Sequence, residues 1–336
     1  MSDSSAEKGP RGFQACSATM NRIAEYRQPV LIYNPTAGKF RRNPKRLLDR
    51  ATYALHQAGV EPRIVPTDHA GHATSLARGL VQAGADLVLV LAGDGTINEV
   101  ANGLAESGVP MGILPGGTAN VLAMELGLGS RVATAAGLLA TSVPRKVGLG
   151  RVVLADGASR YFLMMCGAGL DARIVHDLNS GFKAVAGKLA YWASGLAHVR
   201  YQVQPLDFKA DGLAQRCGFA LISRVRNYGG DLEIARGASL LRNDFEIVLF
   251  EGSNPLRYAW YLSGVLSGKV ESMAGVHVVA SDRAEVLTGA HLQIDGEYLG
   301  RGPAALEMAP EALTLLVPPA YEAHSQEACP PRAVRQ

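Results

Sequence analysis

Three glycine-rich segments of the sequence combine residue types that suit a polyphosphate. They read NPTAGK at 34–39, GDGTINE at 93–99 and PGGTAN at 115–120. Glycine lets a backbone approach phosphate oxygens closely, and the unpaired N–H groups at the start of a helix attract anions. Asp94 and Thr96 are also good helix N-caps, so one such loop by itself leaves a purely structural interpretation open. The three loops together favour a phosphate-binding site.

A second set of chemically active side chains lies in the segment HLQIDGEYL, which begins at His291. If this stretch is one extended strand, Asp295 and Glu297 lie on the same face as His291 and Gln293. Two carboxylates placed side by side can divide into a general base and a metal ligand. The alternative is a hairpin in which Asp295 and Gly296 form the turn and Glu297 is a solvated acid. The residue pattern alone favours the turn.

The elements that must position the three loops are short apolar runs that alternate with amphipathic helix patterns over residues 30–141. The runs VLIY, RIVP, LVLVLA and MGILP each precede a helical pattern, and glycine-rich connections leave three of them. Apolar strands that alternate with helices predict a parallel sheet covered on both faces, which is a three-layer α/β domain. Ligands of such open sheets bind at the carboxyl ends of the strands, where these loops must lie.

After residue 144 the sequence changes to alternating runs separated by Gly and Asp, which predict a mainly antiparallel β-sandwich. Helical patterns occur in this part at 182–199 and 256–268. The predicted organisation is a flexible tail at 1–28, the α/β domain at 29–144, a β-rich domain at 145–321 whose C-terminal end is able to pack back on the first domain, and a flexible tail at 322–336.

Composition limits the classes to which the protein can belong. A chain of 336 residues can bury a sizeable core, and its four cysteines without a C-x-x-C pair indicate neither a zinc site nor a disulfide framework. The N-terminus lacks the apolar core of a signal peptide, and no window reaches the roughly 18 apolar residues that span a bilayer. A net charge of +3 is too balanced to suggest nucleic acid as an obligatory partner. We expect a cytoplasmic protein that is at most peripheral to a membrane.

The order of the motifs resembles the catalytic domain of the diacylglycerol kinase and sphingosine kinase superfamily, and within it the soluble bacterial lipid kinases. The resemblance rests on N-P-x-x-G-K, then G-D-G-T-x-N-E-V-x-N-G, then P-x-G-T-x-N. It continues through CGAGLDARIV, GKLAYWASGL, RNYGGDLEIARGA and LQIDGEYLG, over roughly residues 29–318. It implies an α/β kinase domain and a β-rich lipid-substrate domain, with ATP and Mg²⁺ as cofactors.

The resemblance also implies roles for individual residues. Asp94 would hold Mg²⁺ with ATP, and the D-G-E motif would supply a general base, for which we rank Glu297 ahead of Asp295. The nucleotide-binding residues that it implies are Asn34, Pro35, Thr36, Ala37, Gly38, Thr67, Gly93, Asp94, Gly95, Thr96, Asn98, Glu99, Gly117 and Thr118.

The sequence departs from the family in two places. Ala92 stands where glycine is usual, a small change that should keep the loop. Many bacterial relatives build a structural Mg²⁺ site from adjacent aspartates and a glycine, whereas the matching stretch from Leu240 to Asp244 reads LLRND. This departure argues against the second site, and Arg242 is a candidate to replace the charge of the ion.

Other motifs fit their consensus poorly. GAGLDA at 167–172 is similar to a dinucleotide-binding loop, but no acidic residue lies between Asp177 and Asp207 to bind a ribose. GFKAVAGKL lacks the glycine spacing and the hydroxyl of a Walker A loop. His69 and His72 have metal-like spacing without a third ligand, and we interpret them as exposed loop residues.

The sequence does not decide which lipid is phosphorylated. Diacylglycerol is the first candidate and sphingoid bases or ceramide are the next; an NAD kinase or a catalytically silent nucleotide- or lipid-binding protein is the further alternative. The five basic residues within 39–46 could form a solvated helix start, complement ATP phosphates or dock on anionic headgroups. We expect a lipid substrate at a membrane surface, reached by peripheral contact, and leave a homodimer open.

Overall fold

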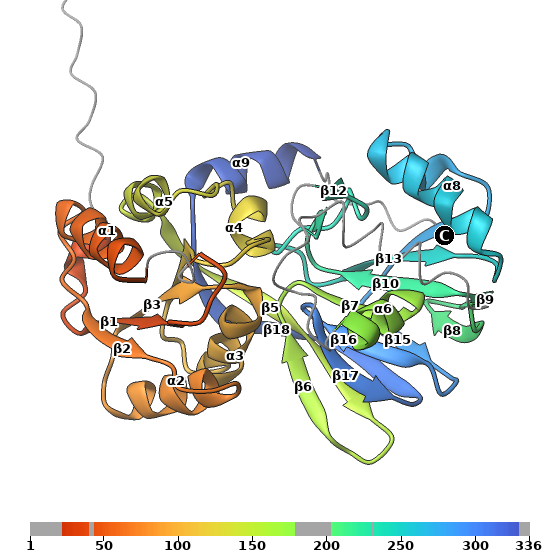
Figure 1. Cartoon of the computed structure of the whole chain (residues 1–336), viewed down its shortest axis with the longest axis horizontal. Coiled ribbons are helices and arrows are strands. Elements are labelled where there is room, and N and C mark those ends of the chain that lie inside the picture. Colours follow the sequence, from red (N-terminus) through yellow and green to blue (C-terminus); the bar gives the residue numbers. More distant parts are fainter. Residues whose placement is uncertain (1–21, 40–43, 179–202, 230–231, 329–336) are drawn as a thin grey trace, which may run out of the picture.

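The computed structural model describes residues 22–39, 44–178, 203–229 and 232–328. Its first part contains a parallel sheet with the strand order β2-β1-β3-β4 (Figure 1). Every residue of β3 and β4 is buried, because a strand between two helix layers has no solvent face. The bounds are β1 (Pro29–Tyr33), β2 (Arg63–Pro66), β3 (Leu87–Ala92) and β4 (Met111–Pro115).

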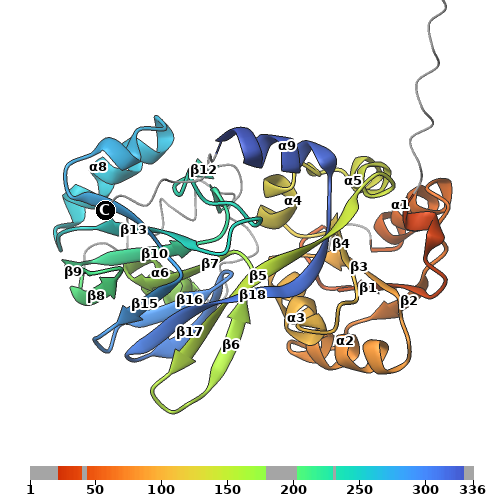
Figure 2. The same cartoon turned by 180° about the vertical axis from the view of Figure 1, so that it is seen from behind.

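Helices cover both faces of this sheet, which confirms the predicted three-layer α/β domain. The pair α1 and α5 lies on one face, and the pair α2 and α3 lies on the other (Figures 1 and 2). A short helix, α4, follows the third glycine-rich loop. The bounds are α1 (Pro44–Gln57), α2 (His72–Gln82), α3 (Asp94–Leu104), α4 (Val121–Glu125) and α5 (Val132–Leu139).

Two long strands carry the sheet beyond the first domain. The strand β18 pairs in parallel with β4 at Leu315 and Met111, and runs antiparallel to β5 along most of its length. The chain therefore passes residue 144, the predicted domain boundary, inside β5. The strands of this extension are β5 (Val143–Leu154), β6 (Ser159–Phe162), β8 (Leu206–Ala210), β9 (Leu213–Cys217), β15 (Arg283–Val286) and β18 (Ala304–Val317).

A second sheet, antiparallel and of order β14-β13-β10-β7-β16-β17, packs on this extension and confirms the predicted β-sandwich. Its inward side chains, such as Ile222 and Phe245, share one buried cluster with Phe208 and Leu306 of the first sheet. The bounds are β7 (Met165–Gly169), β10 (Phe219–Ser223), β13 (Phe245–Phe250), β14 (Val276–Ser281), β16 (His291–Ile294) and β17 (Glu297–Arg301), and the short pair β11 (Asn227–Tyr228) and β12 (Leu232–Glu233) lies beside it.

The remaining helices include one correction to the predicted organisation. Residues 322–328, expected in a flexible tail, belong to α9 (Pro319–Ala328), because Tyr321 is buried and anchors the helix on the domain below it. The helical pattern at 256–268 is confirmed as α8 (Pro255–Leu266). The other elements are α6 (Leu170–Leu178) and the 3-10 turns η1 (Arg22–Glu25) and η2 (Val270–Ser272).

Several expectations concern residues outside the described ranges: most of the N-terminal tail, the centre of the basic cluster at 40–43, the helical pattern at 182–199 and the end of the C-terminal tail. Within the described ranges, no helix has both the length and the apolar character needed to cross a bilayer.

Candidate active site

The three glycine-rich loops meet around one cavity of about 350 Å³ at the carboxyl ends of β1, β3 and β4. One side chain of the second sheet, Glu297, reaches into the same cavity. The lining residues are Asn34, Thr36, Ala37, Gly38, Thr67, Asp68, His69, Ala70, Gly93, Asp94, Gly95, Thr96, Glu99, Gly117, Thr118 and Glu297.

The first loop is fixed to the second by a short hydrogen-bond chain. The amide of Asn34 donates to the hydroxyl of Thr96 (3.0 Å), and its Oδ1 accepts from both the backbone N–H (2.9 Å) and the hydroxyl (2.8 Å) of Thr36. An Asn side chain in this role holds a turn without help from regular structure. Pro35, predicted with this group, does not line the cavity.

Glycine is required where the second and third loops touch. A Cβ on Gly117 would lie 2.5 Å from the Cα of Gly93, so a larger residue would push the two loops apart. The turn of the third loop is closed by Asn120, whose Oδ1 accepts from the N–H of Gly117 (2.7 Å) and whose amide donates to its carbonyl (2.9 Å). Close packing of backbones leaves N–H groups near any phosphate in the cavity.

Asp94 is the first residue of α3 and stands at the wall of the cavity. Its Oδ1 accepts the N–H of Leu122 (3.3 Å), which ties it to the start of α4. Burial raises the pKa of Asp94, and N–H groups of residues 120–122 counteract that rise because they stabilise the ionised form. Magnesium in kinases is held by one or two carboxylates together with substrate phosphates, and Asp94 fits that role.

Two predicted cofactor residues of α3 have structural partners. The carboxylate of Glu99 borders the cavity but accepts the N–H groups of Gly71 (2.8 Å) and Ala73 (3.1 Å), so it caps the start of α2. Asn98 is buried away from the cavity lining, and its Oδ1 accepts from the amide of Asn102 (2.9 Å). Thr67 lines the cavity, and its backbone N–H donates to the carbonyl of Tyr33 (2.9 Å).

Of the two alternatives for the segment through Asp295 and Glu297, the structure shows the hairpin turn that the residue pattern favours, and not a single strand. The strand β16 ends at Ile294, and the positive φ values of Asp295 (47°) and Gly296 (82°) make the two-residue turn of a hairpin. A turn of this kind sends successive side chains in different directions, so the two carboxylates do not share a face.

Asp295 is buried and directed at the backbone of residues 163–165. Its carboxylate accepts the backbone N–H groups of Leu163 (2.8 Å), Met164 (2.9 Å) and Met165 (2.8 Å). Burial raises the pKa of Asp295 to about 7, even though these three donors favour the ionised form. This carboxylate holds the hairpin against the strand that precedes α6.

Glu297, in contrast, lines the cavity. Its Oε1 would lie only 2.8 Å from a Cβ added to Gly95, so the second loop and the second domain touch at this point. Its Oε2 pairs with the guanidinium of Arg160 on β6 (3.1 Å). Of the two carboxylates, Glu297 is therefore the one that lines the cavity, and Arg160 is its partner.

Sequence reasoning missed four residues of this region. Asp68, His69 and Ala70 follow β2 and line the cavity beside Thr67. Their position could have indicated them, because ligands of a parallel sheet bind at the carboxyl ends of its strands and these residues follow β2. Arg160 carried no signal, because it lies 137 residues from its partner in the sequence.

Backbone carbonyls of the stretch from Leu240 to Asp244 surround the guanidinium of Arg224, and not that of Arg242, the candidate that the sequence suggested. Arg224 is completely buried and donates to the carbonyls of Gly148 (3.1 Å), Leu240 (2.8 Å), Asp244 (3.3 Å) and Arg242. Arg242 itself pairs with the carboxylate of Asp244. In the described part of the chain, no group of three His, Cys, Asp or Glu side chains could hold a metal ion.

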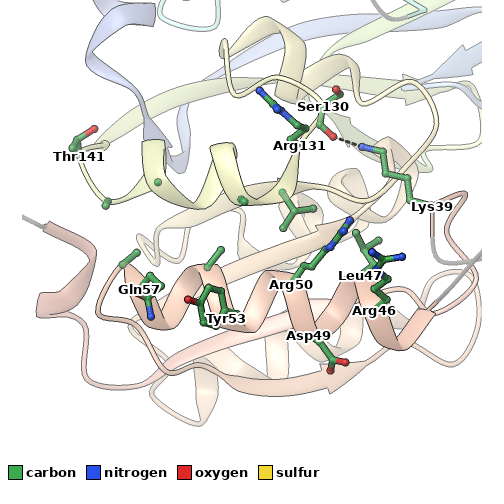
Figure 3. Close-up of a pocket in the computed structure, with 16 residues that line it drawn as sticks. Lys39, Arg46, Leu47, Asp49, Arg50, Tyr53, Gln57, Ser130, Arg131 and Thr141 are labelled. Carbon is green, nitrogen blue, oxygen red and sulfur yellow. Dashed lines mark hydrogen bonds between the residues drawn. The ribbon is translucent and has the colours of Figure 1, made fainter.

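A larger hollow of about 1,090 Å³ is lined by residues of α1 and α5 and is basic at one end (Figure 3). Arg50 reaches from α1 toward α5, while Asp49 points away, and the ammonium of Lys39 donates to the carbonyls of Ser130 (2.5 Å) and Pro115 (3.1 Å). Burial lowers the pKa of Lys39. This hollow lacks the meeting glycine loops, so it is distinct from the candidate active site.

Comparison with known proteins agrees with this geometry. The Diacylglycerol kinase catalytic domain matches residues 28–152, and the YegS C-terminal NAD kinase beta sandwich-like domain matches residues 164–317. Diacylglycerol kinase of Bacillus subtilis (strain 168) is 28% identical over 283 residues, which cover 81% of this chain and 90% of that protein. Diacylglycerol kinase of Staphylococcus epidermidis is 27% identical over 288 residues, 82% of this chain and 87% of that protein.

Solved structures show the same fold. A diacylglycerol kinase from Bacillus anthracis str. Sterne superposes with a TM-score of 0.67 at 22% identity, over 88% of this chain and 99% of that chain. Another solved chain from that organism reaches a TM-score of 0.74 at 22% identity, over 92% of this chain and 100% of that chain. With both domains matched in series around one cavity, the chain belongs to the diacylglycerol kinase superfamily and is a lipid kinase.

Proposed function

We propose that this lipid kinase transfers the γ-phosphate of ATP, with Mg²⁺, to the hydroxyl of diacylglycerol and so forms phosphatidate. The observation that carries the proposal is the position of Glu297, a carboxylate of the lipid-substrate domain, in the cavity of the phosphate-binding loops. The names of the relatives support diacylglycerol ahead of sphingoid bases and ceramide.

The two walls of the cavity have different roles in the proposed reaction. The N–H groups of the three loops would bind the polyphosphate, and Asp94 would hold Mg²⁺, whose charge would neutralise the phosphates. Glu297 accepts the proton of the lipid hydroxyl as the hydroxyl oxygen forms a bond to the γ-phosphorus. The bond from that phosphorus to the bridging oxygen of ADP breaks, and ADP leaves with the electron pair.

Asp295 has a positioning role in this proposal. With three backbone N–H groups on its carboxylate, it fixes the turn that places Glu297, and the proton of the lipid goes to Glu297. Of the two carboxylates that the sequence left open, Glu297 is thus the proposed base.

Contact with a membrane surface is the second part of the proposal. Four cations, Lys39, Arg46, Arg50 and Arg131, border the hollow between α1 and α5. The helix α8, which exposes Leu256 (77%) and Trp260 (46%), lies along the same upper edge of the molecule in Figure 1. Cations attract anionic headgroups, and an exposed Trp suits the membrane interface.

The test is transfer of label from γ-labelled ATP, with Mg²⁺, to diacylglycerol, sphingosine, ceramide or NAD, in mixed micelles or buffer. We expect label in diacylglycerol, lost on omission of Mg²⁺ and in the Asp94→Ala protein. Label only in sphingosine or ceramide would change the substrate, and label only in NAD would overturn the lipid assignment. Sedimentation with anionic and neutral vesicles tests the membrane contact: equal binding to both would contradict the role of the cations.

A further inference from the structure

Glu125, the last residue of α4, is a buried carboxylate outside the cavity with five hydrogen bonds to other parts of the chain. It accepts from the backbone N–H (3.0 Å) and Nε (3.3 Å) of Arg226 and from the backbone N–H (3.4 Å) and side-chain amide (3.0 Å) of Asn227. The fifth donor is the hydroxyl of Tyr321 on α9 (3.0 Å). All of these donors lie beyond the first domain in the sequence.

The donors that surround Glu125 are themselves held in place. Burial and the charge of Glu125 raise the pKa of Tyr321, so its hydroxyl stays protonated and donates, while it also accepts the N–H of Leu240 (3.1 Å). Arg226 lies two residues after Arg224, and the guanidinium of Arg224 is fixed by hydrogen bonds to backbone carbonyls. A buried carboxylate with such partners tolerates little displacement, because each lost donor would leave its charge uncompensated.

The other end of α4 belongs to the active site. The N–H of Leu122 binds Asp94, and Asn120, immediately before the helix, closes the third glycine-rich loop. The five residues of α4 span only about 7 Å, so its two ends lie close together. A shift of Glu125 would therefore move both Asp94 and the third loop.

The donors of Glu125 are connected to Glu297 through the second sheet. Arg226 and Asn227 follow β10, which pairs with β7, and β7 pairs with β16 of the hairpin that carries Glu297. Asp94 and Glu297 come from different domains, so their separation depends on a rigid contact between those domains. The hydrogen bonds of Glu125 provide such a contact between the domains at the end of α4.

We infer that Glu125 is a positioning residue of the kinase: it locks α4 to the second domain and thereby sets Asp94 opposite Glu297. The inference rests on the proposed function, since it assigns Glu125 to the same phosphoryl transfer. Glu125 is not among the residues that line the cavity. Its loss should impair turnover and magnesium use, and leave lipid binding intact.

The test compares the wild type with Glu125→Gln and Tyr321→Phe, and with Glu322→Gln as matched control. Glu322 neighbours Tyr321 on α9 but pairs with Arg145 at the surface. Kinetics at varied Mg²⁺ and diacylglycerol give kcat, the half-saturating Mg²⁺ concentration and KM. We expect about a tenfold lower kcat and about a threefold higher half-saturating Mg²⁺ in Glu125→Gln, with KM for lipid within about twofold, since small misplacements cost turnover steeply.

The smaller change tests the same contact if Glu125→Gln fails to fold. Tyr321→Phe removes one donor and should lower kcat about threefold, whereas Glu322→Gln should match the wild type. A folded Glu125→Gln or Tyr321→Phe protein with wild-type kcat and magnesium dependence would overturn the inference. So would an equal loss of kcat in Glu322→Gln.

A readout without lipid separates this inference from the proposed function. If the wild type labels no lipid, the proposed function fails, but Mg²⁺-dependent ADP binding can still be measured by calorimetry. We expect about threefold weaker binding in Glu125→Gln, because Asp94 and the third loop have moved. Unchanged binding would refute the role of Glu125 independently of the substrate.

Discussion

The two walls of the cavity are built in different ways. The wall from the first domain consists of loops, each placed by a short local pattern of apolar strand, glycine-rich turn and helix. The wall from the second domain depends on one side chain, Glu297, while its near neighbour Asp295 is buried and directed at the backbone of residues 163–165. Local sequence defines where phosphate binds, and tertiary contacts decide which carboxylate faces it.

The carboxylates around the cavity differ in the same way. Asp295 accepts three backbone N–H groups and Glu99 accepts two, whereas Glu297 pairs with the guanidinium of Arg160. The backbone contacts of Asp295 and Glu99 stabilise the fold, whereas Glu297 is directed at the cavity and is available for chemistry. Asp94 combines the two features, because it lines the cavity and also accepts the N–H of Leu122. Substitutions should therefore separate stability from activity.

Asp94→Asn should cause the largest loss of activity. The amide keeps the size of the side chain but cannot hold Mg²⁺ as a carboxylate does, and we expect kcat to fall about a thousandfold. Turnover of diacylglycerol across a Mg²⁺ titration measures this effect. Activity within about tenfold of the wild type at saturating Mg²⁺ would show that the loop wall works without its carboxylate.

Asp295→Asn should cause the largest loss of stability. The amide nitrogen cannot accept the N–H groups now bound to the carboxylate, so the free energy of unfolding should fall by about 2 kcal/mol. Urea denaturation measures the loss. An unchanged midpoint would mean that the three N–H bonds contribute nothing, and the contrast with Glu297 would collapse.

The pH dependence of that loss has a definite sign. Burial raises the pKa of Asp295 from 3.8 to about 7. Between about pH 4 and pH 7 the folded protein therefore keeps a proton that the unfolded chain releases. The stability that this pKa shift contributes is complete below about pH 4 and is lost as the pH rises through about 7. The wild-type advantage over Asp295→Asn should be larger at pH 5 than at pH 8; the reverse order would contradict the raised pKa.

Arg160→Gln should affect activity more than stability. The ion pair with Glu297 is partly exposed, and such pairs contribute about 0–1 kcal/mol. Without it Glu297 samples more orientations, and we expect kcat to fall about fivefold at an unchanged unfolding temperature. Arg160→Lys, which keeps a positive charge, is the control that should recover part of the loss.

Glu99→Gln should have the smallest effect, although Glu99 borders the cavity. Its carboxylate caps α2, so the unfolding free energy should fall by about 1 kcal/mol while kcat stays within about threefold of the wild type. A loss of activity as large as that of Asp94→Asn, in a folded protein, would return Glu99 to the nucleotide-binding residues.

The first domain and its loops could be predicted from the sequence because their signals are local. The apolar runs of β3 and β4 and the glycines that follow them indicate strand, turn and helix without reference to distant residues. Most of the predicted nucleotide residues therefore line one cavity. Asn98 and Pro35 do not, because neighbours in a motif can face opposite sides of a helix or turn.

The second domain could be predicted only in outline. Alternating runs indicated the β-sandwich and the Asp-Gly pair indicated the turn, but the direction of the Asp295 carboxylate depends on backbone N–H groups about 130 residues away. The helix α9 and the carbonyls around Arg224 likewise depend on distant partners, such as Gly148 and Leu240. Such contacts leave no periodic trace in the sequence.

The most direct measurement of the central claim is kcat for diacylglycerol in Glu297→Gln and Asp295→Asn, each at a temperature where circular dichroism shows it fully folded. We predict that Glu297→Gln loses about a hundredfold or more in kcat at wild-type stability, because the base is gone. Asp295→Asn should stay within about tenfold of the wild type once folded. Near-wild-type turnover in Glu297→Gln, with turnover abolished in folded Asp295→Asn, would contradict the assignment of the base.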